Sequence, residues 1–273
     1  MICNMQPSLP ELKTIITVGG RAAAGSWDFH GLIDKGTTQK PNIPAIDIHK
    51  DTSMLLYTSG TTGVPKGARV THYQAVRGGY AYSTGVAAGG EDVFIGFLPC
   101  THAYGCGAIL IQPVLLKSRV VFMEVFRPEE ALRLMEKEGV TLQLAAPTHY
   151  IMELNHSSLK KWNLSKLRAG LIAGMIAPQG LITRVQEEMN LYISSFWGAS
   201  EVGPGLGTIC PPESPLSLRE WSIGQPIADT ETKVVDQAGN DLPSGIIGEM
   251  LVRDWHVMQG YWLNPEETSK QLE

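Results

Sequence analysis

One stretch decides the fold of this protein: Leu55–His72, which reads LLYTSGTTGVPKGARVTH. Apolar residues dominate both of its ends. The nine residues between them, Thr58–Lys66, are nearly all small, hydroxylated or glycine. This pattern predicts two strands joined by a loop that is built to hold phosphate.

Each residue type in this loop has a use in binding a polyphosphate. Glycines let backbone N–H groups converge on an anion without interference from a Cβ atom. The hydroxyl groups are further donors, and Lys66 is a point charge for terminal phosphates. A solvated surface hairpin is the alternative interpretation. We expect nucleotide contacts from Thr58, Ser59, Gly60, Thr61, Thr62, Gly63, Val64, Pro65 and Lys66.

The loop differs from the G-x-x-x-x-G-K-[ST] loop of Walker-type NTPases. Pro65 precedes the lysine and Gly67 follows it. The next segment, GARVTH, reads as a strand, so it offers no helix N-terminus for an anion. A Walker-type NTPase is therefore disfavoured.

Bulk composition narrows the function classes further. The chain has 273 residues, is 43% hydrophobic and carries a net charge of −5, which disfavours a nucleic-acid partner bound through a broad basic surface. No apolar run approaches the roughly 18 residues of a transmembrane helix. The four cysteines form no C-x-x-C pair and are typical of free thiols in a cytoplasmic protein.

Strand-like and helix-like segments alternate over residues 91–205, which predicts an α/β fold with parallel-rich sheets layered with helices. Leu12–Gly20 reads as a further buried strand. After CPPESP the pattern changes to alternating runs, which predict a small antiparallel β-barrel-like unit. We expect three parts: 1–90, a partial α/β subdomain with the phosphate loop; 91–212, an α/β subdomain with adenine and acyl sites; and 213–273, the β subdomain.

Five motifs resemble, in order, those of the adenylate-forming superfamily, which includes acyl- and aryl-CoA synthetases. The resemblance covers nearly the whole chain after about residue 10. The motifs are YTSGTTGVPKG (Tyr57–Gly67), LPCTHAYG (Leu98–Gly105), LRAGLIAGMIAP (Leu167–Pro178), WGASEVGP (Trp197–Pro204) and GEMLVRDWHVMQGYWLNPEET (Gly248–Thr268).

The resemblance implies a catalytic set of Lys66, His102, Ser200 and Glu201. His102 would sit beside the carboxylate substrate, and Glu201 would bind Mg²⁺ with Thr58 as a second ligand. The resemblance also implies an adenine site formed by Gly174, Met175, Ile176, Trp197, Gly198, Ala199 and Ser200. Met175 could equally be a residue that fills a gap in the core. The GEMLVR region at the start of the last motif is interpreted as mostly architectural.

The implied activity is ATP-dependent activation of a carboxylic acid as an acyl-adenylate, followed by transfer to CoA. A fatty acid is favoured as the substrate over an aryl acid. The family's ribose-binding aspartate and mobile C-terminal domain are not found, so we expect a central fragment that is unable to complete turnover. A homodimer is a further possibility that the sequence neither favours nor excludes. The alternative is a non-catalytic nucleotide-binding or interaction module derived from the family.

Overall fold

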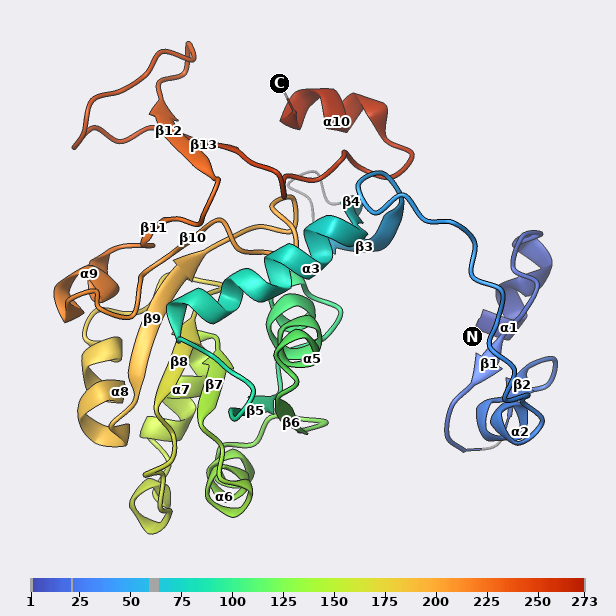
Figure 1. Ribbon diagram of the computed structural model, residues 1–273, viewed down its shortest axis with the longest axis horizontal. Coiled ribbons are helices and arrows are strands. Elements are labelled where there is room, and N and C mark those ends of the chain that lie inside the picture. The colour runs from blue at the N-terminus through green and yellow to red at the C-terminus, as the bar shows by residue number, and fades with distance from the viewer. Residues whose placement is uncertain (1, 21, 59–63, 273) are drawn as a thin grey trace. The chain divides into compact units, whose positions relative to one another are not determined.

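The computed structural model describes residues 2–20, 22–58 and 64–272. The chain divides into two compact units, residues 1–46 and 47–273 (Figure 1). Each unit is described by itself. The boundaries expected at 90/91 and 212/213 remain predictions.

The first unit contains little regular structure. The prediction of a buried strand over Leu12–Gly20 is wrong: only Ile16–Thr17 form a strand, and Ile16 is half exposed. This strand pairs in parallel with just two residues, so no wider sheet forms to cover its apolar side chains. The elements are α1 (Ile2–Met5), η1 (Gln6–Ser8), β1 (Ile16–Thr17), β2 (Trp27–Asp28) and α2 (Phe29–Asp34).

The second unit is built on a seven-stranded sheet. The strand order is β11-β10-β9-β8-β7-β5-β6. Neighbours from β9 to β6 are parallel, and β10 and β11 add an antiparallel edge. The strands are β5 (Val93–Gly96), β6 (Arg119–Phe122), β7 (Leu142–Ala145), β8 (Ala169–Ile172), β9 (Tyr192–Trp197), β10 (Thr208–Ile209) and β11 (Gln225–Pro226).

Helices cover both faces of this sheet (Figure 1). Successive strand residues therefore enter different cores: Ile95 packs with α6, α7 and α8, whereas Phe94 packs on the face of α3 and η3. Burial on two faces explains the continuous apolar strands, and the predicted α/β fold is confirmed. The helices are α3 (His72–Ala81), η2 (Tyr82–Gly85), α4 (Ala103–Gly105), η3 (Cys106–Ile111), α5 (Gln112–Leu116), α6 (Pro128–Glu138), α7 (Pro147–Leu154), η4 (Leu159–Lys161) and α8 (Leu181–Met189).

The two strands around the phosphate loop also form as predicted. β3 (Thr52–Thr58) and β4 (Lys66–Thr71) are antiparallel, and Thr58 pairs with Lys66 where the loop begins and ends. Ala68 and Val70 are fully buried. At the end of β4, Thr71 caps α3 and exchanges hydrogen bonds with Gln74 in a capping box, which fixes the direction in which the chain leaves the hairpin.

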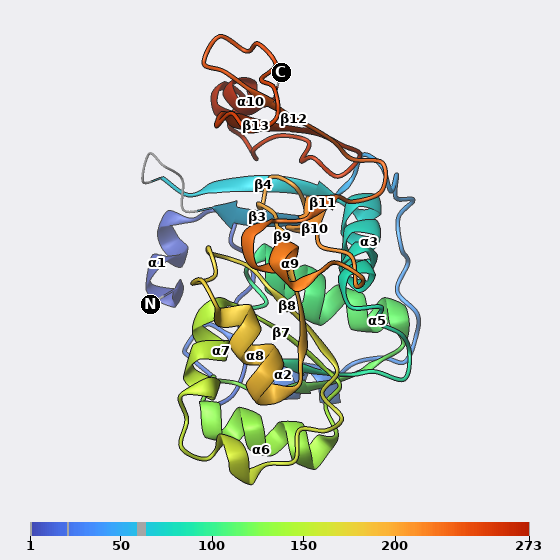
Figure 2. The same cartoon turned by 90° about the vertical axis from the view of Figure 1, so that its left-hand side faces the viewer.

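The C-terminal part departs from the prediction. It holds a two-stranded antiparallel ribbon, and no barrel-like closure is found in the residues described. Helix α9 precedes the ribbon in the chain and packs against α8 and β9, and α10 follows the ribbon. In Figures 1 and 2 the ribbon and α10 lie at the same end of this unit as the β3–β4 hairpin. The elements are α9 (Leu216–Trp221), β12 (Glu231–Val235), β13 (Glu249–Arg253) and α10 (Pro265–Gln271).

Candidate active site

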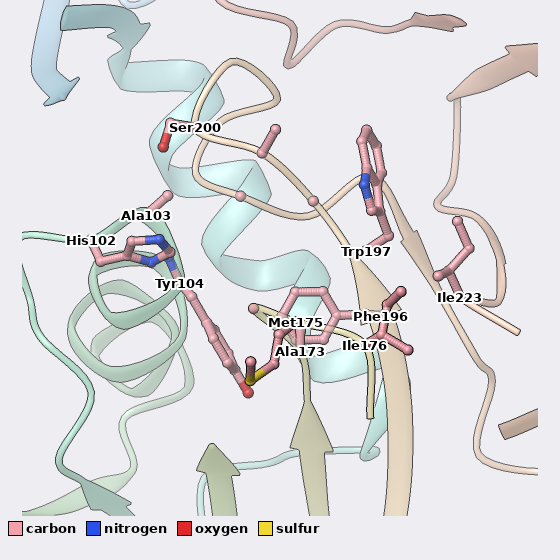
Figure 3. A pocket seen from close by; sticks show the side chains of 14 residues that line it. His102, Ala103, Tyr104, Ala173, Met175, Ile176, Phe196, Trp197, Ser200 and Ile223 are labelled. Atoms are coloured by element: carbon pink, nitrogen blue, oxygen red, sulfur yellow. The ribbon is translucent and has the colours of Figure 1, made fainter. Parts of the chain in front are cut away.

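A cavity of about 340 Å³ opens beyond the carboxyl ends of β8 and β9 (Figure 3). Crevices at this edge of a parallel sheet are the usual binding sites of α/β folds. Three segments that are far apart in the sequence supply most of the lining. The lining residues are His102, Ala103, Tyr104, Ala173, Gly174, Met175, Ile176, Phe196, Trp197, Gly198, Ala199, Ser200, Gly205 and Ile223.

His102 enters the cavity from the N-terminus of α4. Its Nδ1 accepts a hydrogen bond from the backbone N–H of Tyr104 at 3.2 Å. In the neutral imidazole the proton therefore resides on Nε2, which leaves that atom as a donor.

The wall behind His102 is aromatic. The ring of Tyr104 packs edge-on against Phe196 with centroids 4.8 Å apart, and its hydroxyl donates to the carbonyl of Leu171 at 3.1 Å. Burial raises the pKa of the Tyr104 hydroxyl well above its usual value. This hydroxyl therefore stays protonated and serves to hold the wall in place.

The segment after β8 contributes exposed apolar side chains. Gly174 has φ of +90°, a conformation that favours glycine. Met175 is 59% exposed and Ile176 is 94% exposed at the rim of the cavity. Met175 is therefore not a core gap-filler, and its role in an adenine site stays a prediction.

The segment after β9 is held by close backbone packing. A Cβ atom on Gly198 would lie 1.8 Å from the carbonyl oxygen of Gly205, so this position admits only glycine. The carbonyl of Trp197 accepts the N–H of Gly207 at 2.9 Å. This packing anchors the segment Trp197–Ser200, which lines the cavity. In Figure 3, Trp197 lies on the side of Ile223 and Ser200 lies on the side of His102.

A second group of candidate residues lies outside the cavity lining. Lys66 donates to Glu267 Oε2 at 3.0 Å and sits 4.7 Å from the ring centroid of Tyr261. The hydroxyl of Tyr261 donates to Glu201 Oε1 at 2.7 Å. We call Lys66, Glu201, Tyr261 and Glu267 the ion cluster.

One expectation about this cluster needs correction. Lys66 was expected to close the loop, but it begins β4 and its side chain is only 11% exposed, because Glu267 and the Tyr261 ring cover it. The last motif also supplies Tyr261, to which no role was assigned from the sequence and which contacts two candidate catalytic residues. The glycine–tyrosine pair in that motif was the available signal.

The rest of the phosphate loop is described only in part. The candidates Ser59, Gly60, Thr61, Thr62 and Gly63 lie outside the described residues. Val64 and Pro65 are exposed. The Thr58 hydroxyl is buried and finds no hydrogen-bond partner among the residues described, which leaves it able to bind a ligand.

The structure thus gathers eight candidates in the cavity and leaves Lys66, Thr58 and Glu201 outside its lining. The eight are His102, Gly174, Met175, Ile176, Trp197, Gly198, Ala199 and Ser200. Sequence reasoning missed the wall residues Ala103, Tyr104, Ala173, Phe196, Gly205 and Ile223. Ala103, Tyr104 and Ala173 lie within the quoted motifs, and Phe196 and Gly205 adjoin one. Apolar residues at such places could equally belong to the core.

The family model described as "AMP-binding enzyme" matches residues 3–262. The chain belongs to this family. Among similar AMP-binding proteins, the medium-chain fatty-acid–CoA ligase of Escherichia coli (strain K12) is 31% identical over 275 residues, which cover 100% of this chain and 48% of that protein. 4-Coumarate–CoA ligase 5 of Oryza sativa subsp. japonica is 30% identical over 95% of this chain and 49% of its own length.

A solved structure agrees with the family assignment. The anthranilate CoA ligase AuaEII, in complex with anthranoyl-AMP, superposes with a TM-score of 0.88 at 26% identity over 98% of this chain and 51% of that chain. The chain spans about half the length of the curated relatives it matches. None of the described helices is long and apolar enough to cross a membrane.

Glu201 meets the ligand requirements of Mg²⁺. This ion takes one or two carboxylates and completes its shell with water and phosphate oxygens. Among the described residues no cluster of three or more acidic, histidine or cysteine side chains is found, so a metal here would depend on a bound phosphate for further ligands. One oxygen of Glu201 is held by Tyr261, which leaves the other to coordinate.

Proposed function

We propose that this chain forms the nucleotide- and acid-binding part of an ATP-dependent acid–thiol ligase. The observation that carries the proposal is the single cavity into which His102, the Gly174–Ile176 segment and the Trp197–Ser200 segment converge. The reaction would join a carboxylic acid to AMP with release of pyrophosphate, and then pass the acyl group to CoA.

Within this proposal, the cavity residues orient the acid and the adenine. His102 Nε2 donates to the carboxylate oxygen and holds it for attack at phosphorus. Trp197 offers a flat aromatic face for the adenine, and the hydroxyl of Ser200 is a donor for the α-phosphate. The apolar wall formed by Tyr104 and Phe196 favours an apolar acid, either fatty or aryl. We propose a fatty acid first and an aryl acid second.

The phosphate end would be bound by the hairpin and the ion cluster. Lys66 supplies positive charge where negative charge develops on the departing pyrophosphate. Glu201, with the unpaired hydroxyl of Thr58, would hold Mg²⁺. When bound, Mg²⁺ neutralises phosphate charge.

Replacement of Lys66 tests the nucleotide site. Lys66→Met keeps the apolar stem that packs on Tyr261 and removes the charge. We expect the dissociation constant of ATP, measured by calorimetry, to rise about 10- to 100-fold, because a hydrogen bond to a charged phosphate is lost. Lys233→Met, on the exposed β12, is the matched control. Equal ATP affinity in Lys66→Met and the native chain would contradict the proposal.

Isotope exchange between pyrophosphate and ATP separates the enzyme from a binding module. Exchange that depends on an added fatty acid supports acid activation by the chain. Tight ATP binding without exchange for fatty or aryl acids would instead favour a non-catalytic nucleotide-binding module.

A further inference from the structure

The side chain of Tyr261 contacts both Lys66 and Glu201. Its ring lies beneath the Lys66 ammonium, and its hydroxyl donates to Glu201. The residue is 4% exposed. A cation over an aromatic face is attracted by the negative face of the ring, so one side chain restrains two charged groups of opposite sign.

The backbone around Tyr261 is attached to both partners. On one side, Trp262 N–H donates to the Gly67 carbonyl at 2.8 Å, and Arg69 N–H donates to the Gly260 carbonyl at 3.0 Å. On the other side, Met258 N–H donates to the carbonyl of Glu201 at 2.8 Å. The segment 258–262 therefore links strand β4 to the turn that carries Glu201.

The hydroxyl of Tyr261 has a single strong partner among the described residues. It donates to Glu201 Oε1 at 2.7 Å, so one carboxylate oxygen of Glu201 is occupied. With that oxygen held, the carboxylate loses rotational freedom, and its second oxygen has a fixed direction.

We propose that Tyr261 is a positioning residue that sets the Glu201 carboxylate and the Lys66 ammonium for one Mg²⁺–polyphosphate ligand. This inference rests on the proposed function. Tyr261 itself touches neither metal nor phosphate. Its hydroxyl acts on the metal side through Glu201, and its ring acts on the phosphate side through Lys66.

The test is the coupling between Mg²⁺ and ATP, defined as the ATP dissociation constant without Mg²⁺ divided by that with excess Mg²⁺. Tyr261→Phe keeps the ring under Lys66 and removes the hydroxyl. We expect the coupling to fall about tenfold, which corresponds to one hydrogen bond to a charged group, while metal-free ATP affinity stays unchanged.

A double variant shows whether the effect passes through Glu201. Glu201→Gln should lower the coupling at least as far, and Tyr261→Phe should add nothing in the Glu201→Gln background, since residues of one network are non-additive. Additive losses would overturn the assignment.

Tyr82→Phe is the matched control. Tyr82 is also fully buried and donates its hydroxyl to the turn after Glu201, at the carbonyl of Pro204 (3.0 Å). We expect it to leave the coupling unchanged. An equal fall in Tyr82→Phe, or unfolding of Tyr261→Phe in circular dichroism, would show a general packing role and overturn the proposal.

Failure of the Tyr261 proposal and failure of the proposed function would give different results. Native protein that binds ATP with strong Mg²⁺ coupling, together with a Tyr261→Phe variant that behaves identically, would overturn only the role of Tyr261. Native protein that binds no ATP would overturn the proposed function and this inference with it.

Discussion

The cavity and the ion cluster hold their residues in opposite ways. The cavity is formed by segments that directly follow the sheet strands, and backbone packing such as that of Gly198 against Gly205 fixes them. The ion cluster is held by side chains that meet across long sequence separations, as Lys66 meets Glu267. Changes in the cavity should therefore cost fold stability, whereas changes in the cluster should alter the response to ligand.

The largest expected effect is at the cavity. Gly198→Ala would place a methyl group against the carbonyl of Gly205, and backbone cannot move aside as a side chain can. We expect the free energy of unfolding to fall by roughly 3 kcal/mol, measured with urea.

Gly89→Ala is the control for this substitution, since nothing lies within 4 Å of a Cβ atom there. It should change stability by less than about 1 kcal/mol. Comparable losses in both variants would break the claim that close packing holds the cavity.

The sheet beneath the cavity gives the second prediction. Glu153 on α7 is fully buried and accepts a hydrogen bond from Gln143 at 2.7 Å. Burial raises the pKa of Glu153 to about 8, from an ordinary value of 4.5. The folded state therefore keeps a proton that the unfolded state releases, so the free energy of unfolding falls as pH rises from 4.5 to 8.

Glu153→Gln removes this penalty while keeping the shape of the side chain. We expect the variant to exceed the native chain in free energy of unfolding by roughly 4 kcal/mol more at pH 8.5 than at pH 5, since each pKa unit corresponds to about 1.4 kcal/mol. Glu187→Gln, at an exposed position on α8, is the control. Its free energy of unfolding should differ from that of the native chain by the same amount at both pH values. If the stability difference between Glu153→Gln and the native chain does not change with pH, Glu153 does not keep its proton in the folded state.

The smallest effect is expected in the ion cluster. Glu267→Gln removes the carboxylate that accepts from Lys66 and that, under the proposed function, would compete with phosphate for it. We expect ATP to bind about two- to fivefold more tightly, the size of a weak ion pair, with little change in the thermal midpoint.

Glu266→Gln is the neighbouring control on α10, because Glu266 pairs with Lys270 and not with Lys66. It should leave ATP affinity unchanged. Weaker ATP binding in Glu267→Gln would instead mean that Glu267 holds Lys66 in a useful orientation.

Local signals account for most of what was predicted correctly. Helix α6 begins at Pro128, has Glu129 and Glu130 in its first turn, and ends at Gly139 in the left-handed conformation, as the sequence indicates. The alternation over residues 91–205 was readable because β5, β7, β8 and β9 are each a short, mostly apolar run between turn signals. The same signal led to the wrong prediction of a buried strand over Leu12–Gly20. An apolar run forms a buried strand only where neighbouring strands extend the sheet around it.

The sequence by itself determined the α/β class, the family and the cavity candidates His102, Gly174–Ile176 and Trp197–Ser200. Each of these lies in a short motif beside its own strand, so local order fixes its place. Only the tertiary structure decided that Lys66 is covered, that Tyr261 joins it to Glu201, and that Met175 faces outward. Those outcomes depend on which distant segments pair, and residue types along a chain do not specify pairing across two hundred residues.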